Sequence, residues 1–567
     1  MKPPTGRLST LACLSITAGI LQPLTSCSSP QYAPPPPPVA MFYGGGETES
    51  GAPLRKRKLP PKPDSLSDYG SLPAPAPPPP PVHAAATRSG GFSFRRPSAP
   101  ANTESYDTVE EIPFRPTKQD SLSTFSIDVD TASYTNVRRL LTSGERVPSG
   151  AVRIEEMVNY FTYSYPQPNG TAPFSVNTEV ASCPWAPGHK LVRIGLHGRE
   201  IAKTSRPAAN LVFLIDVSGS MGDPAKLPLV QSSLRLLVNE LNPQDRIAIT
   251  VYAGASGLVL PSTPCSEKER ILKAIDKLEA GGSTNGGEGI ELAYATAKQH
   301  FISGGINRVI IATDGDFNVG TTDESSLVKL IQQKAKSGIY LSVLGYGIGN
   351  YKDSTLEKLA DKGNGNYAYI DTLNEARKVL VKQAGASLIT IAKDVKIQVE
   401  FNPSNVAAYR LLGYENRKLE HQDFDDDTKD AGEIGSGHTV TALYEIIPAG
   451  QPVPGAKDIP LKYTATAAPT AAAASGELLT VKLRYKRPGQ SSSQLLQQVV
   501  QNSGQTFDHA DSDFRFATAV TAFGMKLRGS PHAKAISSRQ IRSWASSSVG
   551  SDPDGYRREF VKLAGKL

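Results

Sequence analysis

The chain has 567 residues, of which 39% are hydrophobic, and its 61 Lys and Arg residues against 54 Asp and Glu give a formal net charge of +7. This charge is modest for such a length and does not by itself indicate a polyanionic partner. After the first 24 residues, no stretch approaches the roughly 20 apolar residues that a membrane-spanning helix needs, which excludes a polytopic membrane protein.

The amino terminus has the features of a secretory signal. Two basic residues precede a mostly apolar stretch, residues 8–24, that is too short and too interrupted to span a membrane. The tetrapeptide Leu-Thr-Ser-Cys that ends at Cys27 resembles a bacterial lipobox. This resemblance implies that residues 1–27 are a lipoprotein signal and that Cys27 becomes the acylated first residue of the mature chain, with palmitate among its acyl groups.

An acylated cysteine would anchor the chain in a bacterial cell envelope without a transmembrane helix. In lipoproteins that are sorted by the residue after the cysteine, a residue other than Asp, here Ser28, implies the outer membrane if the source is a diderm bacterium. An ordinary cleaved signal with an incidental cysteine is the alternative. In either case the chain is exported, so we expect no nucleic-acid partner.

Residues 28–105 are rich in Pro, Ala, Gly and Ser, with proline runs at 34–38 and 77–81. Such a composition cannot bury enough apolar surface to fold, so we expect a disordered linker. In a polyproline II conformation of about 3 Å per residue, the linker would reach at most on the order of 200 Å. It would therefore hold the folded part well away from a membrane.

Residues 106–206 form a mixed α/β flanking region. Asp128 and Asp130 have the spacing of a metal-binding pair, but the end of a strand followed by a helix cap explains the same pattern. Strands are expected over residues 124–129, 174–181 and 190–196, and helices after Asp130 or Thr131 and over residues 154–161.

Residues 207–385 alternate strands with helical patterns, which is typical of an α/β domain with a doubly wound parallel sheet. The apolar run at residues 211–215 has the near-continuous hydrophobicity of a central strand that is buried on both faces. Further strands are expected over residues 247–252, 310–313, 340–344 and 367–370.

Polar residues follow the strands of this region. The central strand ends in Asp216, and Ser218 and Ser220 follow it at alternate positions. Farther along, a glycine-rich loop carries Thr284, and the next apolar run is followed by Asp314. Loops at the carboxyl ends of parallel strands meet in one crevice, where open α/β sheets bind ligands. Carboxylate and hydroxyl oxygens are hard donors that suit Mg²⁺ or Mn²⁺.

These five positions resemble the von Willebrand factor type A domain with its metal-ion-dependent adhesion site, whose motif is DxSxS, a distant Thr and a distant Asp. The resemblance implies that Ser218, Ser220 and Thr284 ligate the metal, while Asp216 and Asp314 act directly or through waters. Asp and Ser also cap helices after strands, but the presence of all five positions in order favours the metal site.

Residues 386–486 read as a β-sandwich-like region, with strands expected over residues 394–401, 407–412, 439–447 and 477–485. Strands from before residue 206 are expected to complete this sandwich, since α/β domains of this kind are inserted into β domains. An acidic loop, residues 423–427, lacks the Gly and Glu of a calcium loop, so we expect a solvated hairpin.

Residues 487–567 are expected to be helical, with one face of a helix over residues 514–527 formed by Phe516, Val520, Phe523 and Leu527. The stretch DSDFRFATAVTAFGMKLRGS, like the order of residues 106–206, resembles the YfbK-like lipoproteins that carry a type A domain.

Two cysteines remain in the exported chain, Cys183 and Cys265. In an oxidising compartment they can form a disulfide that joins the flanking region to the type A domain. Two buried free thiols are the equal alternative, because the sequence does not give the distance between them.

The resemblance implies a binding module, namely a lipid-anchored protein whose Mg²⁺ or Mn²⁺ accepts a carboxylate from an unidentified partner protein. Neutral hydroxyl ligands leave the cation electrophilic, so an acidic side chain from outside completes its shell. A metal-assisted hydrolase and a scaffold of an envelope or ATPase-associated complex are the alternatives. The sequence has no HExxH or GxSxG motif and no His near the metal motif, so we expect no catalytic residues and no enzymatic activity.

Overall fold

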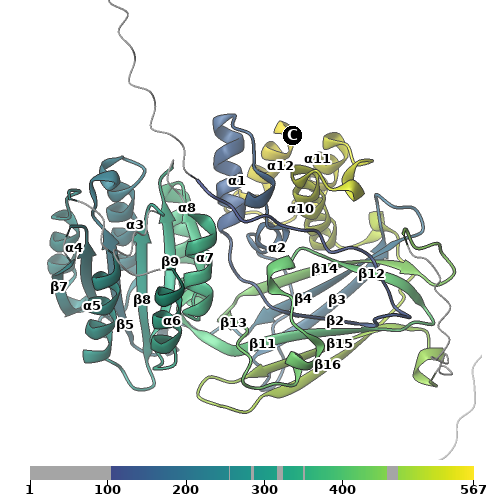
Figure 1. The fold of residues 1–567 in the computed structure, drawn as a ribbon, viewed down its shortest axis with the longest axis horizontal. Helices are drawn as coiled ribbons and strands as arrows, with labels where there is room; N and C mark the ends of the chain where they lie inside the picture. Colours follow the sequence, from purple (N-terminus) through teal and green to yellow (C-terminus); the bar gives the residue numbers. More distant parts are fainter. Residues whose placement is uncertain (1–103, 255, 283–285, 316–323, 349–351, 456–469) are drawn as a thin grey trace, which may run out of the picture. The chain divides into compact units, whose positions relative to one another are not determined.

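The structure is a computed structural model that describes residues 104–254, 256–282, 286–315, 324–348, 352–455 and 470–567 (Figure 1). Cys27 and the expected linker up to residue 103 lie outside the described residues, as does Thr284. Among the helices of the described part, none is both long and apolar enough to cross a membrane.

A six-stranded sheet with the order β10-β9-β8-β5-β6-β7 forms the centre of the type A domain. Five strands run parallel, as expected, while the edge strand β7 is antiparallel to β6. Strand β7 was not predicted because it contains Gly and two Pro residues, which only an edge strand tolerates. The strands are β5 (Ala209–Asp216), β6 (Arg246–Tyr252), β7 (Ser256–Pro264), β8 (Ile306–Thr313), β9 (Tyr340–Tyr346) and β10 (Tyr367–Ile370).

Strand β5 is buried along its whole length because helices cover both faces of the sheet (Figure 1). Phe213 and Ile215 belong to a core cluster that includes residues of α3, α4 and α8. Val212 and Leu214, which point to the opposite face, belong to a cluster with residues of α5, α6 and α7. The helices are α3 (Leu227–Glu240), α4 (Lys268–Asp276), α5 (Gly286–Gln299), α6 (Glu324–Ala335), α7 (Asp353–Lys362) and α8 (Leu373–Arg377), with the short α9 (Ala384–Leu388) after them.

Two further sheets combine strands from both sides of the type A domain. Their strand orders are β1-β12-β14-β4-β3 and β13-β11-β15-β16, and β2 pairs with β11. Strand β4 pairs with β14 and β2 with β11, which confirms that strands from before the type A domain join those after it. The strands are β1 (Arg115–Pro116), β2 (Leu122–Ser126), β3 (Phe174–Ser182), β4 (Lys190–Gly198), β11 (Thr390–Phe401), β12 (Val406–Leu412), β13 (Gly432–Gly435), β14 (Thr439–Pro448), β15 (Glu477–Lys486) and β16 (Gln494–Gln501).

Helices from both ends of the described chain share one aromatic-rich core cluster. Phe516, Val520 and Phe523 are fully buried on the longest of them, as the helical periodicity predicts. Near the other end of the chain, Tyr134 and Met157 belong to the same cluster. The helices are α1 (Ala132–Ser143), α2 (Ile154–Asn159), α10 (Ser512–Arg528), α11 (Ser538–Ser546) and α12 (Tyr556–Leu563).

Candidate functional site

Four of the five residues of the expected metal motif lie together at the carboxyl ends of β5 and β8. These strands are neighbours and run parallel, so their final residues meet at the same edge of the sheet. The backbone N–H of Ser218 donates to Asp216 Oδ1 at 2.9 Å, and the hydroxyl oxygens of Ser218 and Ser220 lie 3.1 Å apart. The hydroxyl of Ser220 donates to Asp314 Oδ2 at 2.8 Å. The motif thus forms one connected group of oxygen atoms.

Burial and neighbouring charge both act on the Asp216 carboxyl group. The side chain is fully buried, and this desolvation raises its pKa, as does the nearby charge of Asp314. Hydrogen bonds from Ser218 act in the opposite direction. Tyr252 also donates to Asp216 Oδ2 at 3.0 Å, so the carboxylate is fixed in orientation by neighbours on two sides.

Lys226 also contacts this group, although its place in the sequence did not indicate a role. It precedes α3, and its side-chain ammonium donates to Asp314 Oδ2 at 2.8 Å, the oxygen that also accepts from Ser220. Lys226 is only 7% exposed and Asp314 is fully buried. The sequence did not indicate this residue, because a lysine before a helix is usually solvated.

The donor atoms suit a hard divalent cation. Two hydroxyl groups and two carboxylates supply oxygen ligands, which Mg²⁺ and Mn²⁺ prefer over nitrogen and sulfur. Thr284, the remaining expected ligand, lies outside the described residues. The other residues expected to hold the metal therefore have the chemistry that such an ion requires, while the Lys226 ammonium supplies a positive charge beside it.

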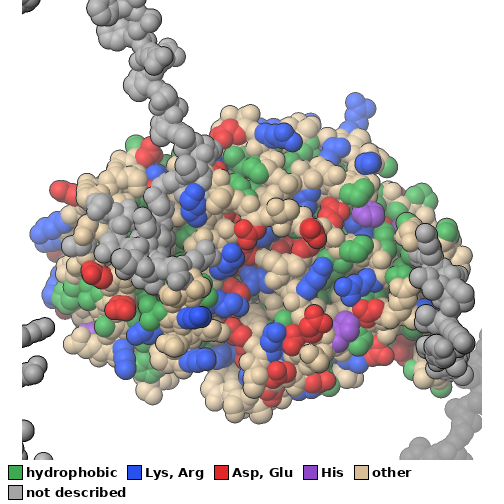
Figure 2. Space-filling model, viewed as in Figure 1, with side chains coloured by type: hydrophobic (Ala, Val, Ile, Leu, Met, Phe, Trp, Pro, Cys, Tyr) green, Lys and Arg blue, Asp and Glu red, His purple; other side chains and the backbone are tan. Residues whose placement is uncertain are grey.

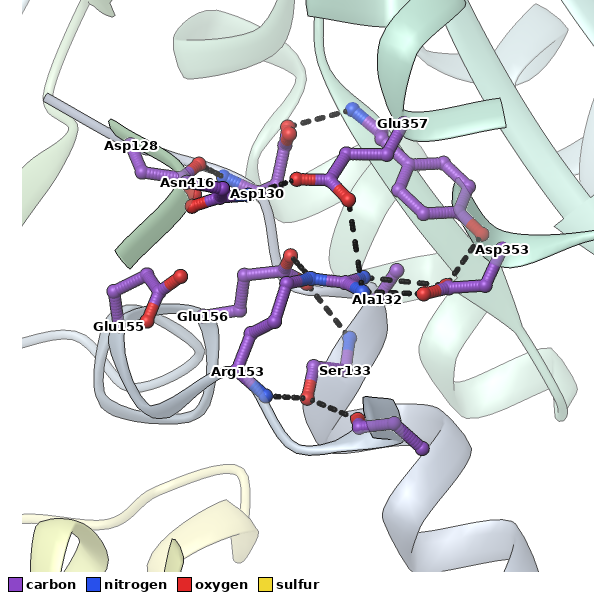
Figure 3. Close-up of polar contacts among 12 residues, drawn as sticks. Asp128, Asp130, Ala132, Ser133, Arg153, Glu155, Glu156, Asp353, Glu357 and Asn416 are labelled. Carbon is purple, nitrogen blue, oxygen red and sulfur yellow. Dashed lines mark hydrogen bonds and ion pairs between the residues drawn. The ribbon is translucent and has the colours of Figure 1, made fainter. Parts of the chain in front are cut away.

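A second polar cluster joins the flanking region to the type A domain, and Arg153 lies at its centre (Figure 3). This buried guanidinium pairs with Glu156 on α2 and with Asp353 at the start of α7. Glu357, one turn farther along α7, lies 3.6 Å from Arg153 Nη1. Burial raises the pKa of Glu156 and of Glu357, which the charge of Arg153 partly offsets.

Arg417 is the second arginine of this cluster, and it explains the Asp128 and Asp130 pair. Its guanidinium lies 3.2 Å from Asp128 Oδ2 and 3.2 Å from Asp130 Oδ2, and it also pairs with Asp361 on α7. Asp130 accepts a hydrogen bond from the backbone of Tyr367 on β10 at 2.7 Å. The two aspartates thus form ion pairs to an arginine. Thr131, one of the two expected helix caps, is the N-cap of α1, although its side chain makes no capping hydrogen bond.

Glu155 borders a polar cavity of about 540 Å³ beside this cluster. One carboxylate oxygen accepts from the backbone of Tyr414 at 2.9 Å, while the other has no hydrogen-bond partner among the described residues. Burial raises the pKa of Glu155 to about 7, and the charge of Glu415 acts in the same direction.

At the outer surface, acidic and basic side chains are interspersed on the face drawn in Figure 2.

A group of three carboxylates that the sequence did not indicate lies in the flanking sheets. Ligand atoms of Asp394, Asp430 and Glu433 lie within 4.8 Å of one another. The ammonium of Lys486 contacts Asp394 at 2.8 Å and neutralises part of this charge. Burial raises the pKa of Asp430 to about 6. In the nearby acidic loop, Asp423 pairs with Lys429 and Asp425 with Arg484, and both interactions are exposed or partly exposed. The loop was expected to be a solvated hairpin, but it joins β12 to β13, which belong to different sheets.

The cysteine pairing proposed as one of two alternatives does not form in this structure. Cys183 and Cys265 are both buried free thiols. Cys183 follows β3 and packs in the aromatic-rich cluster, whereas Cys265 follows β7 and packs in the core of the type A domain. Because the two side chains belong to different cores, the fold keeps them apart. Burial raises the pKa of both thiols, that of Cys265 to about 12.

Models of three protein families match this chain. The von Willebrand factor type A domain matches residues 210–383, and a model described as von Willebrand factor matches residues 100–193. A model described as the C-terminal part of uncharacterized protein YfbK matches residues 386–567. Uncharacterized protein YfbK of Escherichia coli (strain K12) is 45% identical over 468 residues, which cover 81% of this chain and 80% of that protein. The chain belongs to the YfbK family.

More distant relatives share shorter segments with this YfbK-family chain. Uncharacterized protein sll0103 of Synechocystis is 27% identical over 33% of this chain and 43% of its own length. Inter-alpha-trypsin inhibitor heavy chain H4 of Homo sapiens is 28% identical over 27% of this chain and 17% of its own length. The chain thus spans less than half of either protein.

Solved structures resemble the YfbK-family chain more weakly. A von Willebrand factor type A protein from Catenulispora acidiphila is 18% identical, with a TM-score of 0.38, and the match covers 71% of this chain and 91% of that chain. The ArnB paralog VWA2 from Sulfolobus acidocaldarius is 14% identical, with a TM-score of 0.34, over 70% and 97%. TM-scores this low support no conclusion about this chain.

Proposed function

We propose that this YfbK-family protein binds a partner protein through a divalent cation, Mg²⁺ or Mn²⁺, at the group formed by Asp216, Ser218, Ser220 and Asp314, with Thr284 as a further ligand. The observation that supports this most directly is the convergence of the four described side chains at the ends of β5 and β8. A cation bound there would offer an electrophilic position to a carboxylate of the partner.

The chain's own residues prepare this position in two ways. Backbone and Tyr252 hydrogen bonds hold the Asp216 carboxylate, so little side-chain ordering would remain to be achieved on binding. Ser220 is exposed, whereas Asp216 and Ser218 are buried, so the group opens to solvent on the side of Ser220. An acidic side chain of a partner would approach from that side. We assign binding to this site, and no catalytic step.

Isothermal titration with Mg²⁺ and with Mn²⁺ tests the metal site. We expect Ser218→Ala and Ser220→Ala to lose a ligand and to bind either ion at least about 10-fold more weakly than the wild type, because a hard cation tolerates few missing oxygens. Ser232→Ala is the matched control, because that hydroxyl lies on α3 and, among the described residues, bonds only to the Pro228 carbonyl. The wild type and the control should bind equally.

A second measurement links the metal to binding of a partner. Purified protein immobilised on a matrix is exposed to an envelope extract in the presence of Mg²⁺ and then of a chelator. A protein that is retained by the wild type in Mg²⁺, released by chelator and not retained by Ser218→Ala would support the proposal. If the wild type binds neither ion at millimolar concentration, or if the alanine variants bind both ions as well as the wild type, the metal-site proposal is wrong.

We also propose that the chain is anchored to the bacterial cell envelope through an acylated Cys27, in the outer membrane if the source is diderm. The lipobox-like tetrapeptide supports this. Fractionation of cells that express Cys27→Ala should show the protein unprocessed or released, because acyl chains contribute about 0.8 kcal/mol per buried methylene to membrane retention. Unchanged processing and membrane association in this variant would rule out the anchor.

A further inference from the structure

Lys226 is buried beside the candidate metal site. Its side chain is 9% exposed, and its ammonium lies 2.8 Å from Asp314 Oδ2. The backbone on either side of it is fixed, since Lys226 N donates to the carbonyl of Asp223 and the Lys226 carbonyl accepts from Val230 N, both at 2.9 Å. The lysine is therefore held toward Asp314 and is not a surface side chain that happens to fold inward.

The loop after β9 leaves room for the stem of this lysine. At Gly347, whose φ is +75°, a Cβ atom would lie 2.5 Å from both Cγ and Cε of Lys226. Real Cβ atoms do not approach other atoms this closely, so a side chain at position 347 would force the lysine stem to move. Tyr369 donates to the Gly347 carbonyl at 2.5 Å and fixes the loop in this position. Two segments far apart in sequence thus pack against each other at this lysine.

We propose that Lys226 is a built-in cation that sets the metal affinity of this site, so that the site binds its divalent ion weakly and depends on a partner's carboxylate for full occupancy. This inference rests on the function proposed above. It adds that Lys226, a residue outside the DxSxS motif, determines how strongly a bound carboxylate increases the affinity of the site for its metal.

The charges explain this role. Among the described residues of the site, Asp216 and Asp314 carry two negative charges when ionised, which a divalent cation would balance alone. The Lys226 ammonium adds a third positive charge and shares an oxygen of Asp314 with the hydroxyl of Ser220. The occupied site would then carry a net positive charge, which weakens the hold on the metal and favours an incoming carboxylate. Without Lys226, the occupied site would be neutral.

Titration calorimetry with Mn²⁺ on the full-length protein tests this inference. We expect Lys226→Met, which keeps an unbranched stem beside Gly347, to bind Mn²⁺ about 10-fold or more tightly than the wild type, equivalent to about 1.4 kcal/mol. Lys226→Gln should shift the affinity in the same direction, because it keeps a hydrogen-bond donor but loses the charge. Lys298→Met, on the exposed surface of α5, removes the same charge elsewhere and is the matched control.

A gain in metal affinity separates this role from a structural one, because a variant that only damaged the fold would bind the metal more weakly. A second titration adds millimolar acetate, which should increase the Mn²⁺ affinity of the wild type more than that of Lys226→Met. If both Lys226 variants bind Mn²⁺ as weakly as the wild type or the Lys298→Met control, the inference is wrong while the metal site stands. If none of these proteins binds Mn²⁺, both the inference and the proposed function are wrong.

Discussion

Replacing Arg153 by Met would test whether the buried ion pairs between the flanking region and the type A domain contribute to stability. The Arg153 side chain is 6% exposed, and its partners Glu156 and Asp353 are 0% and 1% exposed. Removal of one member of a buried ion pair leaves an uncompensated charge and typically costs about 3–5 kcal/mol. We expect a loss in this range near pH 8. The loss should be smaller in acid, because burial raises the pKa of Glu156, which then accepts a proton.

Urea unfolding followed by far-ultraviolet circular dichroism measures this loss. At a slope of about 3 kcal/mol per molar urea, the unfolding midpoint should fall by about 1 M or more. Arg235→Met is the matched control, since Arg235 pairs with Asp276 at 2.6 Å but both side chains are 46% exposed. Exposed pairs contribute about 0–1 kcal/mol, so this variant should unfold almost as the wild type does. Equal midpoints for Arg153→Met and Arg235→Met would refute the reasoning.

Two further predictions concern ionisable groups in the core. Burial raises the pKa of Glu155 to about 7, so its stabilising proton is fully bound below the ordinary value of 4.5 and is lost as the pH rises through 7. The unfolding free energy of the wild type should therefore decrease between pH 5 and pH 8, and in Glu155→Gln this decrease should be smaller by about 2 kcal/mol. An identical pH profile for the two proteins would contradict this. Cys183 and Cys265 should both resist iodoacetamide at pH 8 in the native protein and react in urea, because thiols with raised pKa values are unreactive. Mass spectrometry that finds a disulfide between them would contradict the structure.

The five parallel strands of the type A domain could be predicted from the sequence because their hydrophobic pattern is local. The apolar run of β5 and the polar residues after it lie within ten positions, and Asp314 follows the neighbouring parallel strand. Parallel pairing then requires these strand ends to meet. For the same reason, the helical face of α10 could be predicted from the periodicity of its own residues.

The remaining contacts could not be predicted, because they join residues that no local pattern connects. Arg153 and Asp353 are 200 positions apart, and Arg417 and Asp128 are 289 positions apart. Lys226 and Asp314 are separated by 88 positions. The edge strand β16 was missed for another reason: five of its eight residues are exposed, and its four glutamines obscure the alternation of a strand.

The pairing of β2 with β11 and of β4 with β14 constrains the order in which the protein folds. The type A sheet draws all its strands from residues 209–370, so it can form as soon as that segment has been synthesised. Strand β2, by contrast, ends at residue 126, and its partner begins at residue 390. At about 5–20 residues per second, this partner is synthesised roughly 10–50 s later. Strand β4 likewise ends at residue 198, while its partner β14 begins at residue 439. For a similar interval the apolar residues of β4, such as Ile194 and Leu196, lack the strand that covers their edge. A chain cut short after residue 385 would keep them exposed permanently, and its type A domain would be joined to an unpaired, aggregation-prone segment.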